Sequence, residues 1–417
     1  VETDMLTNYN VFVLNQTMPN NSAVSFSNAN TIRQGGARDA NVSALSFNIR
    51  DKKNRYDLNG FGKVSYVEDP AFDAPSAGFA YSVGLSKVSG NLTFDLIHTV
   101  EDKNYDPNDL GILHANDKMS NFVGIKYSKY EPRWVYKSYT AWWGNPIDHR
   151  ISSNTFQTYK PNFGIEMLFK NNWLINWYNE AAPLWTRDYY EPRVEGRWYN
   201  QVPYVYSQLY VGTDARKKIS VSGHVAWAES PNTDDPLYEI EVAPTVRVSD
   251  RWSVGYATFM SLDKGNYGFI YMLNEDSIYL GRRVIDRVVN AFNTTYNFSP
   301  TLSFSLRARH YWTQLTYKRL YFLERNGDRT STDVADPRQF DTNFDAVNVD
   351  AVVSWQFAPG SFMTLAWKNA VLYRDGHVEF DYFDNARHAW EAPKSNQVSL
   401  KMIYYLDVVK VKSWLDR

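Results

Sequence analysis

Residues 301–317 read TLSFSLRARHYWTQLTY, and this stretch alternates between apolar and polar side chains. Because successive side chains of an extended strand point to opposite faces, such alternation predicts a β-strand with one apolar and one polar face. The apolar face would carry Leu302, Phe304, Leu306 and Ala308, and the polar face Ser303, Ser305, Arg307 and Arg309. A strand of this kind needs an apolar medium on one side and a polar space on the other.

The composition excludes several classes of protein. The chain of 417 residues carries 44 Lys and Arg against 46 Asp and Glu, so it lacks the basic excess that binds nucleic acid. It contains no cysteine, which excludes a disulfide framework, a thiolate metal site and a catalytic cysteine, and we expect no cofactor. No run of about 18 apolar residues occurs, which excludes a transmembrane helix but not the strands of a transmembrane barrel, which are only about 9 to 11 residues long.

Similar alternation recurs from one end of the chain to the other. Residues 237–248 alternate without slippage, placing Tyr238, Ile240, Val242, Pro244, Val246 and Val248 against Glu239, Glu241, Ala243, Thr245 and Arg247. We count about nineteen such segments, near 8–17, 24–33, 40–50, 56–66, 78–88, 91–102, 119–129, 134–144, 155–169, 173–183, 202–213, 219–228, 237–249, 252–263, 286–298, 302–316, 343–357, 361–372 and 396–408.

The connections between these segments alternate between short and long. Tight turns are expected at 89–91, 170–172, 214–218, 249–251, 299–301 and 358–360. Long polar loops are expected at 103–118, 184–201, 264–285, 317–342 and 373–395. Short turns at one rim and long loops at the other are typical of outer-membrane barrels, with the short turns periplasmic and the long loops extracellular.

The aromatic residues favour the same architecture. The chain has 30 Tyr, 23 Phe and 14 Trp, more than a core of ordinary size needs. Rings gather near strand ends, as at Trp173, Trp177, Trp252, Tyr256, Tyr311, Trp312, Trp355, Phe357, Tyr404 and Tyr405. Aromatic girdles at the two membrane interfaces explain that placement, and Trp312 would lie in the outer girdle. The sequence therefore predicts an all-β fold, a large antiparallel transmembrane β-barrel of about 18 to 20 strands.

Strand parity bears on domain organisation. Bacterial single-chain barrels have an even number of strands, and with the short turns at the periplasm the first segment runs inward from the outer rim. At least one strand should precede that segment. We therefore expect residues 1–417 to form a single barrel domain that lacks upstream strands and an N-terminal periplasmic or binding module.

Several segments carry a resemblance to a known family. The stretches are NYDPNDLGIL (104–113), YYEPRVEGRWY (189–199) and IYLGRR (278–283), with TNYNVFVLNQ near the start and SLKMIYYLD near the end. They resemble an uncharacterised barrel family of Bacteroidetes-type outer membranes, in which the barrel usually follows a carbohydrate-binding module of the family-9-like type. The resemblance spans essentially the whole chain and implies fold and location. This chain lacks the module, so the glycan binding of the module is not implied for it.

Charged residues on the polar faces form the main candidate site. Counting from the turns at 299–301 and 358–360 places Arg309 opposite Asp350, with Arg307 near Asn348. Glu239, Glu241 and Arg247 belong to the same lumen charge network. An arginine on the lipid face at mid-depth would cost roughly 2–4 kcal/mol, so these side chains should point inward. They either fill the lumen as a charge ladder or line an opening that selects solutes.

The expected loop at 184–201 is rich in rings and guanidinium groups. It contains Trp185, Tyr189, Tyr190, Arg193, Arg197 and Trp198. These side chains either contact a sugar, lipopolysaccharide or protein partner, or pack on one another to order the loop.

Three further clusters invite a chemical interpretation. Asp106, Asn108 and Asp109 precede Gly111 and could be calcium ligands, but Leu110 breaks the ligand pattern of an EF-hand and a turn explains them as well. His377, His388, Asp381 and Asp384 share one loop, yet their spacing specifies no metal geometry. His224 lies on a polar face with Ser220 and Ser222, either as the base of a hydrolase or as a residue that fills the lumen.

These observations predict a non-enzymatic integral protein of the outer membrane of a Gram-negative bacterium. It would act as a porin-like conduit or as a barrel subunit of a larger envelope complex. The alternatives are a plugged barrel that serves as an interaction scaffold in glycan handling, secretion or protein export, and a barrel-embedded hydrolase. The expected partners are outer-membrane lipid, lipopolysaccharide, other envelope proteins and glycans.

Overall fold

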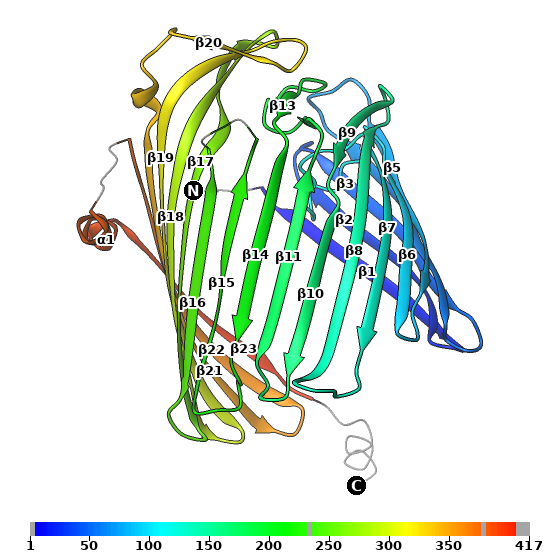
Figure 1. Cartoon of the computed structure of the whole chain (residues 1–417), viewed down its shortest axis with the longest axis vertical. Coiled ribbons are helices and arrows are strands. Elements are labelled where there is room, and N and C mark those ends of the chain that lie inside the picture. The colour runs from blue at the N-terminus through cyan, green and yellow to red at the C-terminus, as the bar shows by residue number, and fades with distance from the viewer. Residues whose placement is uncertain (1–4, 232, 234, 377–380, 406–417) are drawn as a thin grey trace.

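The main sheet is antiparallel and has 21 strands, most of which pair with their neighbours along the chain, and it is rolled into a barrel (Figure 1). The computed structural model describes residues 5–231, 233, 235–376 and 381–405. The elements are β1 (Thr7–Met18), β2 (Ser22–Arg33), β3 (Asp39–Arg50), β4 (Tyr56–Glu68), β5 (Ser76–Lys87), β6 (Leu92–Glu101), β7 (Lys118–Lys129), β8 (Tyr136–Arg150), β9 (Thr155–Tyr159), β10 (Asn162–Phe169), β11 (Leu174–Ala182), β12 (Thr186–Asp188), β13 (Tyr199–Gln201), β14 (Tyr204–Gly212), β15 (Ile219–Glu229), β16 (Leu237–Arg247), β17 (Trp252–Asn274), β18 (Ser277–Ser299), β19 (Leu302–Leu323), β20 (Arg329–Thr332), η1 (Pro337–Phe340), β21 (Thr342–Ala358), β22 (Ser361–Asp375), α1 (Tyr382–Glu391) and β23 (Lys394–Ile403).

Most of the strands build the barrel wall in chain order. Two strands of the sheet, β9 and β20, pair only with the loop ends of β8 and β19, and the other nineteen follow one another around the wall. Strands β12 and β13 form a separate small sheet. Each of the nineteen predicted segments contains one wall strand, which confirms the strand prediction, although 155–169 divides into β9 and β10.

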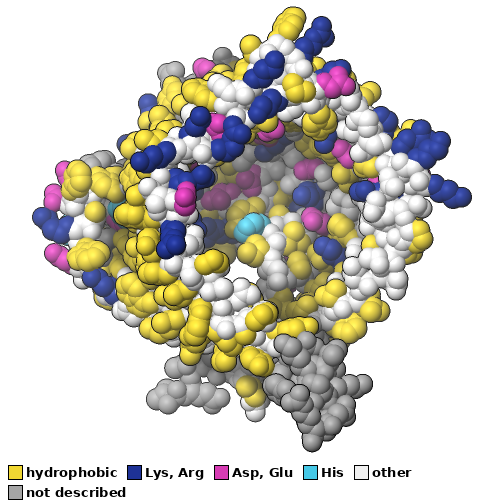
Figure 2. All heavy atoms as spheres, turned by 90° about the horizontal axis from the view of Figure 1, so that it is seen from below, with side chains coloured by type: hydrophobic (Ala, Val, Ile, Leu, Met, Phe, Trp, Pro, Cys, Tyr) yellow, Lys and Arg dark blue, Asp and Glu magenta, His cyan; other side chains and the backbone are white. Residues whose placement is uncertain are grey.

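The two faces of the wall differ as alternation predicts. Strand β5 is the clearest case, because large exposed side chains alternate with small buried residues. The outward set is Phe79, Tyr81, Val83 and Leu85, and the inward set is Gly78, Ala80, Ser82, Gly84 and Ser86. Many large apolar side chains are exposed, and in the view from below charged side chains of both signs lie within the hollow (Figure 2). A sheet with an apolar exterior, in which every wall strand between the first and the last is paired on both sides, suits a bilayer, and the fold is a large antiparallel transmembrane β-barrel.

The two rims of the barrel are built differently. The predicted tight turns all lie at one rim, and the long connections lie at the other. Tight turns between antiparallel strands need a left-handed backbone, which asparagine and glycine adopt most readily. Asn172 (φ 62°), Gly90 (φ 85°) and Gly360 (φ 71°) supply it here. We refer to these ends as the short-turn rim and the long-loop rim.

One predicted loop is a hairpin. Residues 264–285 continue β17 and β18, which pair as far as Asn274 and Ser277 and project beyond the rim. The pairing register shifts three times along this extension, and each shift interrupts the period of two by which sequence alternation is recognised. Stacked rings of Tyr271 and Tyr279, 4.8 Å between centroids, stabilise the extension as a cross-strand pair. The loop prediction for 264–285 was therefore wrong, as it was for the start of 317–342, since β19 continues to Leu323.

The wall has a seam between its first and last strands. Among the described residues, β1 pairs only with β2 and β23 only with β22. Both strands run from the long-loop rim to the short-turn rim, as they must when nineteen strands alternate in direction. Side chains of β1 such as Val11 are exposed, in this case by 71%. The expectation that further strands precede β1 stays a prediction.

Helix α1 lies outside the barrel, against the wall formed by β18, β19 and β21 (Figure 1). It covers polar side chains on the outward-facing side of that wall. His310 Nδ1 lies 2.8 Å from the hydroxyl of Tyr382, and His310 Nε2 lies 2.5 Å from Asp345 Oδ1. Asn385 donates to the other oxygen of Asp345, and Asn290 donates to Tyr382 (2.7 Å). The helix therefore supplies the hydrogen-bond partners that lipid could not. We call His310, Asp345, Asn290, Tyr382 and Asn385 the outer polar network.

Trp312 joins the covered surface. It faces outward as predicted, but its side chain is only 8% exposed because the ring of Tyr382 lies over it, 5.4 Å between centroids. Its Nε1 donates to Asn343 (2.9 Å). The prediction that Trp312 forms part of a lipid-facing girdle was wrong, because α1 stands between this ring and the membrane. No helix in the described ranges is long and apolar enough to cross a membrane.

Loss of Asp345 should destabilise the barrel. Asp345→Ala leaves His310 and Asn385 without their acceptor in a buried position, and we expect the free energy of unfolding to fall by about 1–3 kcal/mol. Urea titration of the protein in lipid vesicles measures this change. The matched control is Asp350→Ala in the same strand, since Asp350 faces the lumen, where water can solvate its neighbours. Equal losses for the two variants would contradict a stabilising role for the outer polar network.

Candidate functional site

The lumen is the candidate site, and one part of its wall combines carboxylates with tyrosines. Glu180 on β11 accepts hydrogen bonds from the hydroxyls of Tyr178 (2.9 Å) and Tyr204 (2.7 Å). Tyr206 on β14 donates to Glu239 on β16 (3.4 Å). The phenols hold these carboxylates against the wall, and both glutamates are half-buried. We call this region the acidic wall.

Sequence reasoning found part of the acidic wall and missed part. Glu239 and Glu241 were predicted to face inward, and the register places both on the lumen side. Glu180 and its tyrosines were missed. The segment YVYSQLY at 204–210 puts Tyr204, Tyr206 and Tyr210 on the polar face of its strand, and that placement was the signal available.

His224 sits in the acidic wall opposite Glu241, its pairing partner on β16. Its ring lies 6.0 Å from the ring of Phe259. Within the described ranges no serine or threonine makes a hydrogen bond to this imidazole, so the contact that a hydrolase needs between its nucleophile and its base is not formed. The geometry favours a residue that lines the lumen.

A basic region lies farther around the same wall. Arg307 on β19 pairs in register with Asp350 on β21, which in turn pairs with Lys368 on β22. Arg309 pairs with Asn348 one step nearer the long-loop rim. Arg307 and Arg309 are both exposed although they point into the barrel. No ion pair joins Arg307 to Asp350 in the described part of the chain. We call this region the basic wall.

The predicted partners in the basic wall were shifted by two residues. We expected Arg309 opposite Asp350 and Arg307 near Asn348, and the structure exchanges the two arginines. The count assumed that β19 and β21 leave the short-turn rim at the same level. These strands belong to different turns, and strands of a tilted barrel are staggered against one another. Leu302 pairs with Trp355, so the residues nearest the turn on β21 lie below the start of β19. The register places all four side chains on one face of the wall.

Arg247 is the remaining residue of the predicted network. It lies at the short-turn end of β16, paired with Ser253, and is exposed. Its distance along the strand from Glu239 and Glu241 separates it from the acidic wall.

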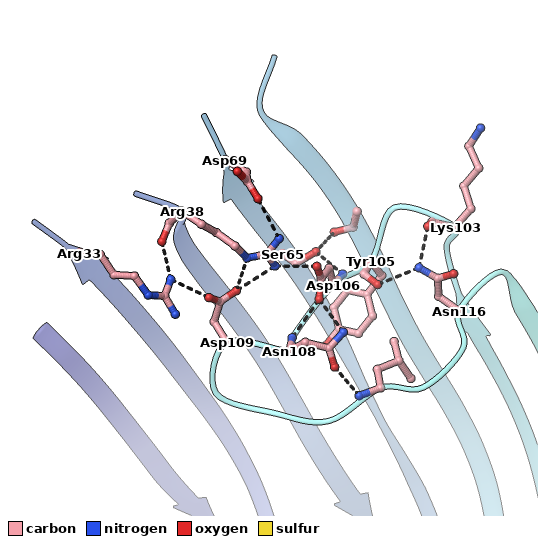
Figure 3. Close-up of polar contacts among 12 residues, drawn as sticks. Arg33, Arg38, Ser65, Asp69, Lys103, Tyr105, Asp106, Asn108, Asp109 and Asn116 are labelled. Atoms are coloured by element: carbon pink, nitrogen blue, oxygen red, sulfur yellow. Dashed lines mark hydrogen bonds and ion pairs between the residues drawn. The ribbon is translucent and has the colours of Figure 1, made fainter. Parts of the chain in front are cut away.

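The loop that connects β6 and β7 folds onto the inner face of the barrel (Figure 3). Asp106 donates its backbone N–H to Ser65 Oγ (3.0 Å) on β4, and Tyr105 is only 5% exposed. A Cβ atom on Gly78 of β5 would lie 2.1 Å from the backbone of this loop. The approach therefore depends on the absence of a side chain at that position. We call residues 102–117 the inner loop.

Arg38 fastens the inner loop to the wall (Figure 3). Its Nη2 lies 2.7 Å from Asp106 and 2.9 Å from Asp109, and Arg33 contacts Asp109 at 2.8 Å. The hydrogen bond to Asp109 raises the pKa of the Arg38 guanidinium. Burial raises the pKa of Asp106, but its hydrogen bonds from Arg38 and Asn108 outweigh burial, so this pKa stands below its usual value.

The same contacts bear on the calcium interpretation of the inner loop. Asp106 Oδ1 accepts from the backbone N–H (3.0 Å) and the side-chain amide (2.7 Å) of Asn108, which is the pattern of a turn. The carboxylates of Asp106 and Asp109 are held by guanidinium groups. The arrangement favours the turn over a calcium site. No group of three or more metal-binding side chains is found among the described residues.

The aromatic loop between β11 and β14 packs on neighbouring loops. Tyr189 lies beside Trp198 (5.6 Å between centroids) and under Arg150, and Tyr190 meets His114 edge-on. Arg197 donates to the backbone of β19 at Leu323 O (2.8 Å). These contacts tie the loop to β8, to the loop between β6 and β7 and to β19, and they favour the packing interpretation for most of its rings.

Three side chains of this loop are exposed, although two of them also contact a neighbouring ring. Trp185 and Tyr190 remain exposed to solvent over about half of their surface. Arg193 has a left-handed backbone (φ 57°) and lies 4.8 Å from the ring of Phe269. These residues are the part of the loop that is open to a partner.

The histidine cluster of the last long loop is only partly described. His388 and Asp384 lie on α1, where Asp384 pairs with Arg387 (2.8 Å). Asp381 immediately precedes the helix. His377 lies outside the described residues.

The wall, the lumen and the inner loop define a large transmembrane β-barrel with a charged interior. A model for the family described as Domain of unknown function (DUF5916) matches residues 1–415, and the chain belongs to this family. The match agrees with the resemblance to an uncharacterised family, while the link to a carbohydrate-binding module stays a prediction. No curated protein matches the chain. A solved structure titled Pseudomonas aeruginosa OccK2 (OpdF) in complex with glucuronate is similar over 88% of this chain and 91% of that one, with 10% identity and a TM-score of 0.37.

The attachment of the inner loop should depend on pH. The folded pKa of Asp106 is below its unfolded value of about 4, so its contribution is present above that value and is lost as the pH falls through the folded pKa. Hydrogen exchange of residues 103–112, corrected for intrinsic rates, should show less protection at pH 3 than at pH 6.

Substitutions separate the Arg38 contacts from a general effect of acid. Arg38→Gln should reduce protection of the inner loop already at pH 6. Arg325→Gln, which removes an exposed ion pair with Asp276 in another loop, should change nothing there. If the inner loop keeps its protection at pH 3, Arg38 is not what fastens it.

Proposed function

We propose that this protein is a porin-like conduit, without enzymatic activity, integral to the outer membrane of a Gram-negative bacterium. One observation carries the proposal: charged side chains on the inner face border open space. Arg307 and Arg309 point inward and are exposed, and the interior seen from below is hollow (Figure 2). A lumen filled by a charge ladder would pair such groups. Neither arginine makes an ion pair with any described residue.

The distribution of lumen charge supports the passage of polar solutes. The acidic wall presents Glu180, Glu239 and Glu241, and the basic wall presents Arg307 and Arg309. Walls of opposite sign create a field in the lumen that orients a polar solute. The inner loop narrows the lumen from the side of β4 and β5, where Asp106 donates its backbone N–H to Ser65 Oγ.

A second candidate is a barrel subunit of a larger envelope complex. It is favoured by polar residues on the outer surface near the seam, where lipid would be expected. Asn28 donates to Asn41 (3.0 Å) and Ser43 (2.9 Å) on the outward side of β2 and β3. A protein partner against this side would explain polar groups that lipid does not favour, as it would in a scaffold for glycan handling, secretion or protein export.

Other partners follow from location. The apolar outer surface would contact outer-membrane lipid and lipopolysaccharide. Trp185 and Tyr190 would be available to glycans at the long-loop rim. These partner assignments are part of the proposal and rest on the solvent exposure of the side chains concerned.

Conductance tests the proposed function. Purified protein in planar bilayers should give steady ionic current. Arg307→Glu combined with Arg309→Glu should raise cation over anion permeability by about two- to fivefold, because the substitutions reverse the charge of the basic wall. The measurement is the reversal potential in a salt gradient.

The control for this experiment is Arg387→Glu. Arg387 is exposed on α1 outside the barrel, so Arg387→Glu changes the net charge in the same direction, by half as much, without altering the lumen. A correctly folded barrel that passes no current would overturn the conduit. Current with unchanged selectivity would show that ions do not pass the basic wall.

A further inference from the structure

A cavity of about 740 Å³ opens in the inner wall near the long-loop rim. It is bordered by β19, β21, the η1 segment and the tip of the aromatic loop. Aromatic rings make up much of its wall, namely Phe269, Tyr311, Tyr317, Phe340 and Phe344. A volume of this size lies within the range of about 300–1,000 Å³ that holds small-molecule ligands.

Three guanidinium groups line the same cavity. They belong to Arg193, Arg283 and Arg374, whereas Asp341 is the single described carboxylate in the lining. Asp341 Oδ1 accepts from the backbone N–H of Tyr317 (2.6 Å) and so serves the local fold. The cavity is therefore strongly positive, and none of the three arginines makes an ion pair with a described residue.

The guanidinium groups are held in different ways. Arg283 donates to Asn266 Oδ1 (2.7 Å) and to the hydroxyl of Tyr317 (3.1 Å), which fixes its plane. Arg193 lies against the ring of Phe269, 4.8 Å from the centroid. Arg374, paired in register with Phe344, is exposed and makes no hydrogen bond to a described residue. The guanidinium group of Arg283 is therefore preorganised, whereas those of Arg193 and Arg374 retain free hydrogen-bond donors.

We propose that this cavity binds a small organic anion with a carboxylate group and a flat or apolar body. Arginine presents paired donors that match the two oxygens of a carboxylate, and the aromatic rings bury the body of the ligand. This inference rests on the proposed conduit only because a ligand would reach the cavity through the lumen. It adds to that proposal the class of solute that binds. We call this cavity the anion cavity.

Binding can be measured without any transport. The protein in detergent micelles is titrated with naphthalene-2-carboxylate, with protein-free micelles as the blank. Naphthalene-2-carboxamide has the same shape without the charge. We expect saturable binding of the carboxylate at one site, weaker binding of the carboxamide, and loss of affinity as salt is added.

Substitutions locate the binding. Arg374→Gln and Arg193→Gln should each weaken carboxylate binding about five- to tenfold, because each removes a charged hydrogen-bond donor. Arg374→Lys should recover part of the loss, since it keeps the charge without the paired donors. Arg247→Gln is the matched control, because Arg247 also faces the lumen but lies at the short-turn end of β16. Arg374 and Arg193 are exposed, so these variants should fold.

The outcomes separate this inference from the proposed function. Equal binding of carboxylate and carboxamide, or carboxylate binding that survives both substitutions, would overturn the anion cavity. Equal weakening by Arg247→Gln would overturn it as well. Carboxylate binding lost on Arg374→Gln, in a barrel that carries no current, would support the cavity and overturn the conduit. Steady current without carboxylate binding would support the conduit and overturn the anion cavity.

Discussion

Hydrocarbon offers no partner to a backbone N–H or C=O group, and the rest of this structure depends on that constraint. Each interior wall strand meets it by pairing with both neighbours. Once pairing is fixed, the pleat sends successive side chains to opposite faces. Tyr238 and Ile240 therefore lie outside, while Glu239 and Glu241 lie inside. The charged lumen and the apolar exterior are two results of one arrangement of backbone hydrogen bonds.

Departures from the regular wall occur where another segment replaces lipid or water as the neighbour. On the inner face, the absence of a side chain at Gly78 lets the inner loop lie against β5. On the outer face, His310 and Asp345 are polar because α1 supplies their partners. At the long-loop rim, β17 and β18 continue past the membrane, where their neighbours are other loops. Each departure thus marks a tertiary contact.

The sequence predicted the wall well because alternation is a local property. All nineteen segments contain wall strands, and the register places Arg307, Arg309 and Asp350 on one face of the wall. Three features of the structure could not be predicted from local alternation. The pairing of Arg309 with Asn348 depends on stagger between strands that belong to different turns. The projecting hairpin is interrupted by register shifts that hide its period. The anion cavity joins Arg193, Arg283 and Arg374 from three distant segments, and nothing local brings them together.

The outer polar network has a consequence for the order of assembly. Asp345 and His310 come from neighbouring strands, while Tyr382 and Asn385 arrive only after β22 has been placed. If this part of the wall entered the bilayer first, it would expose a carboxylate to hydrocarbon until the helix docked, and such an intermediate is costly. Helix α1 must therefore be in position before, or together with, the entry of β19 and β21. A segment that follows β22 in the chain thus controls when β19 and β21 can insert.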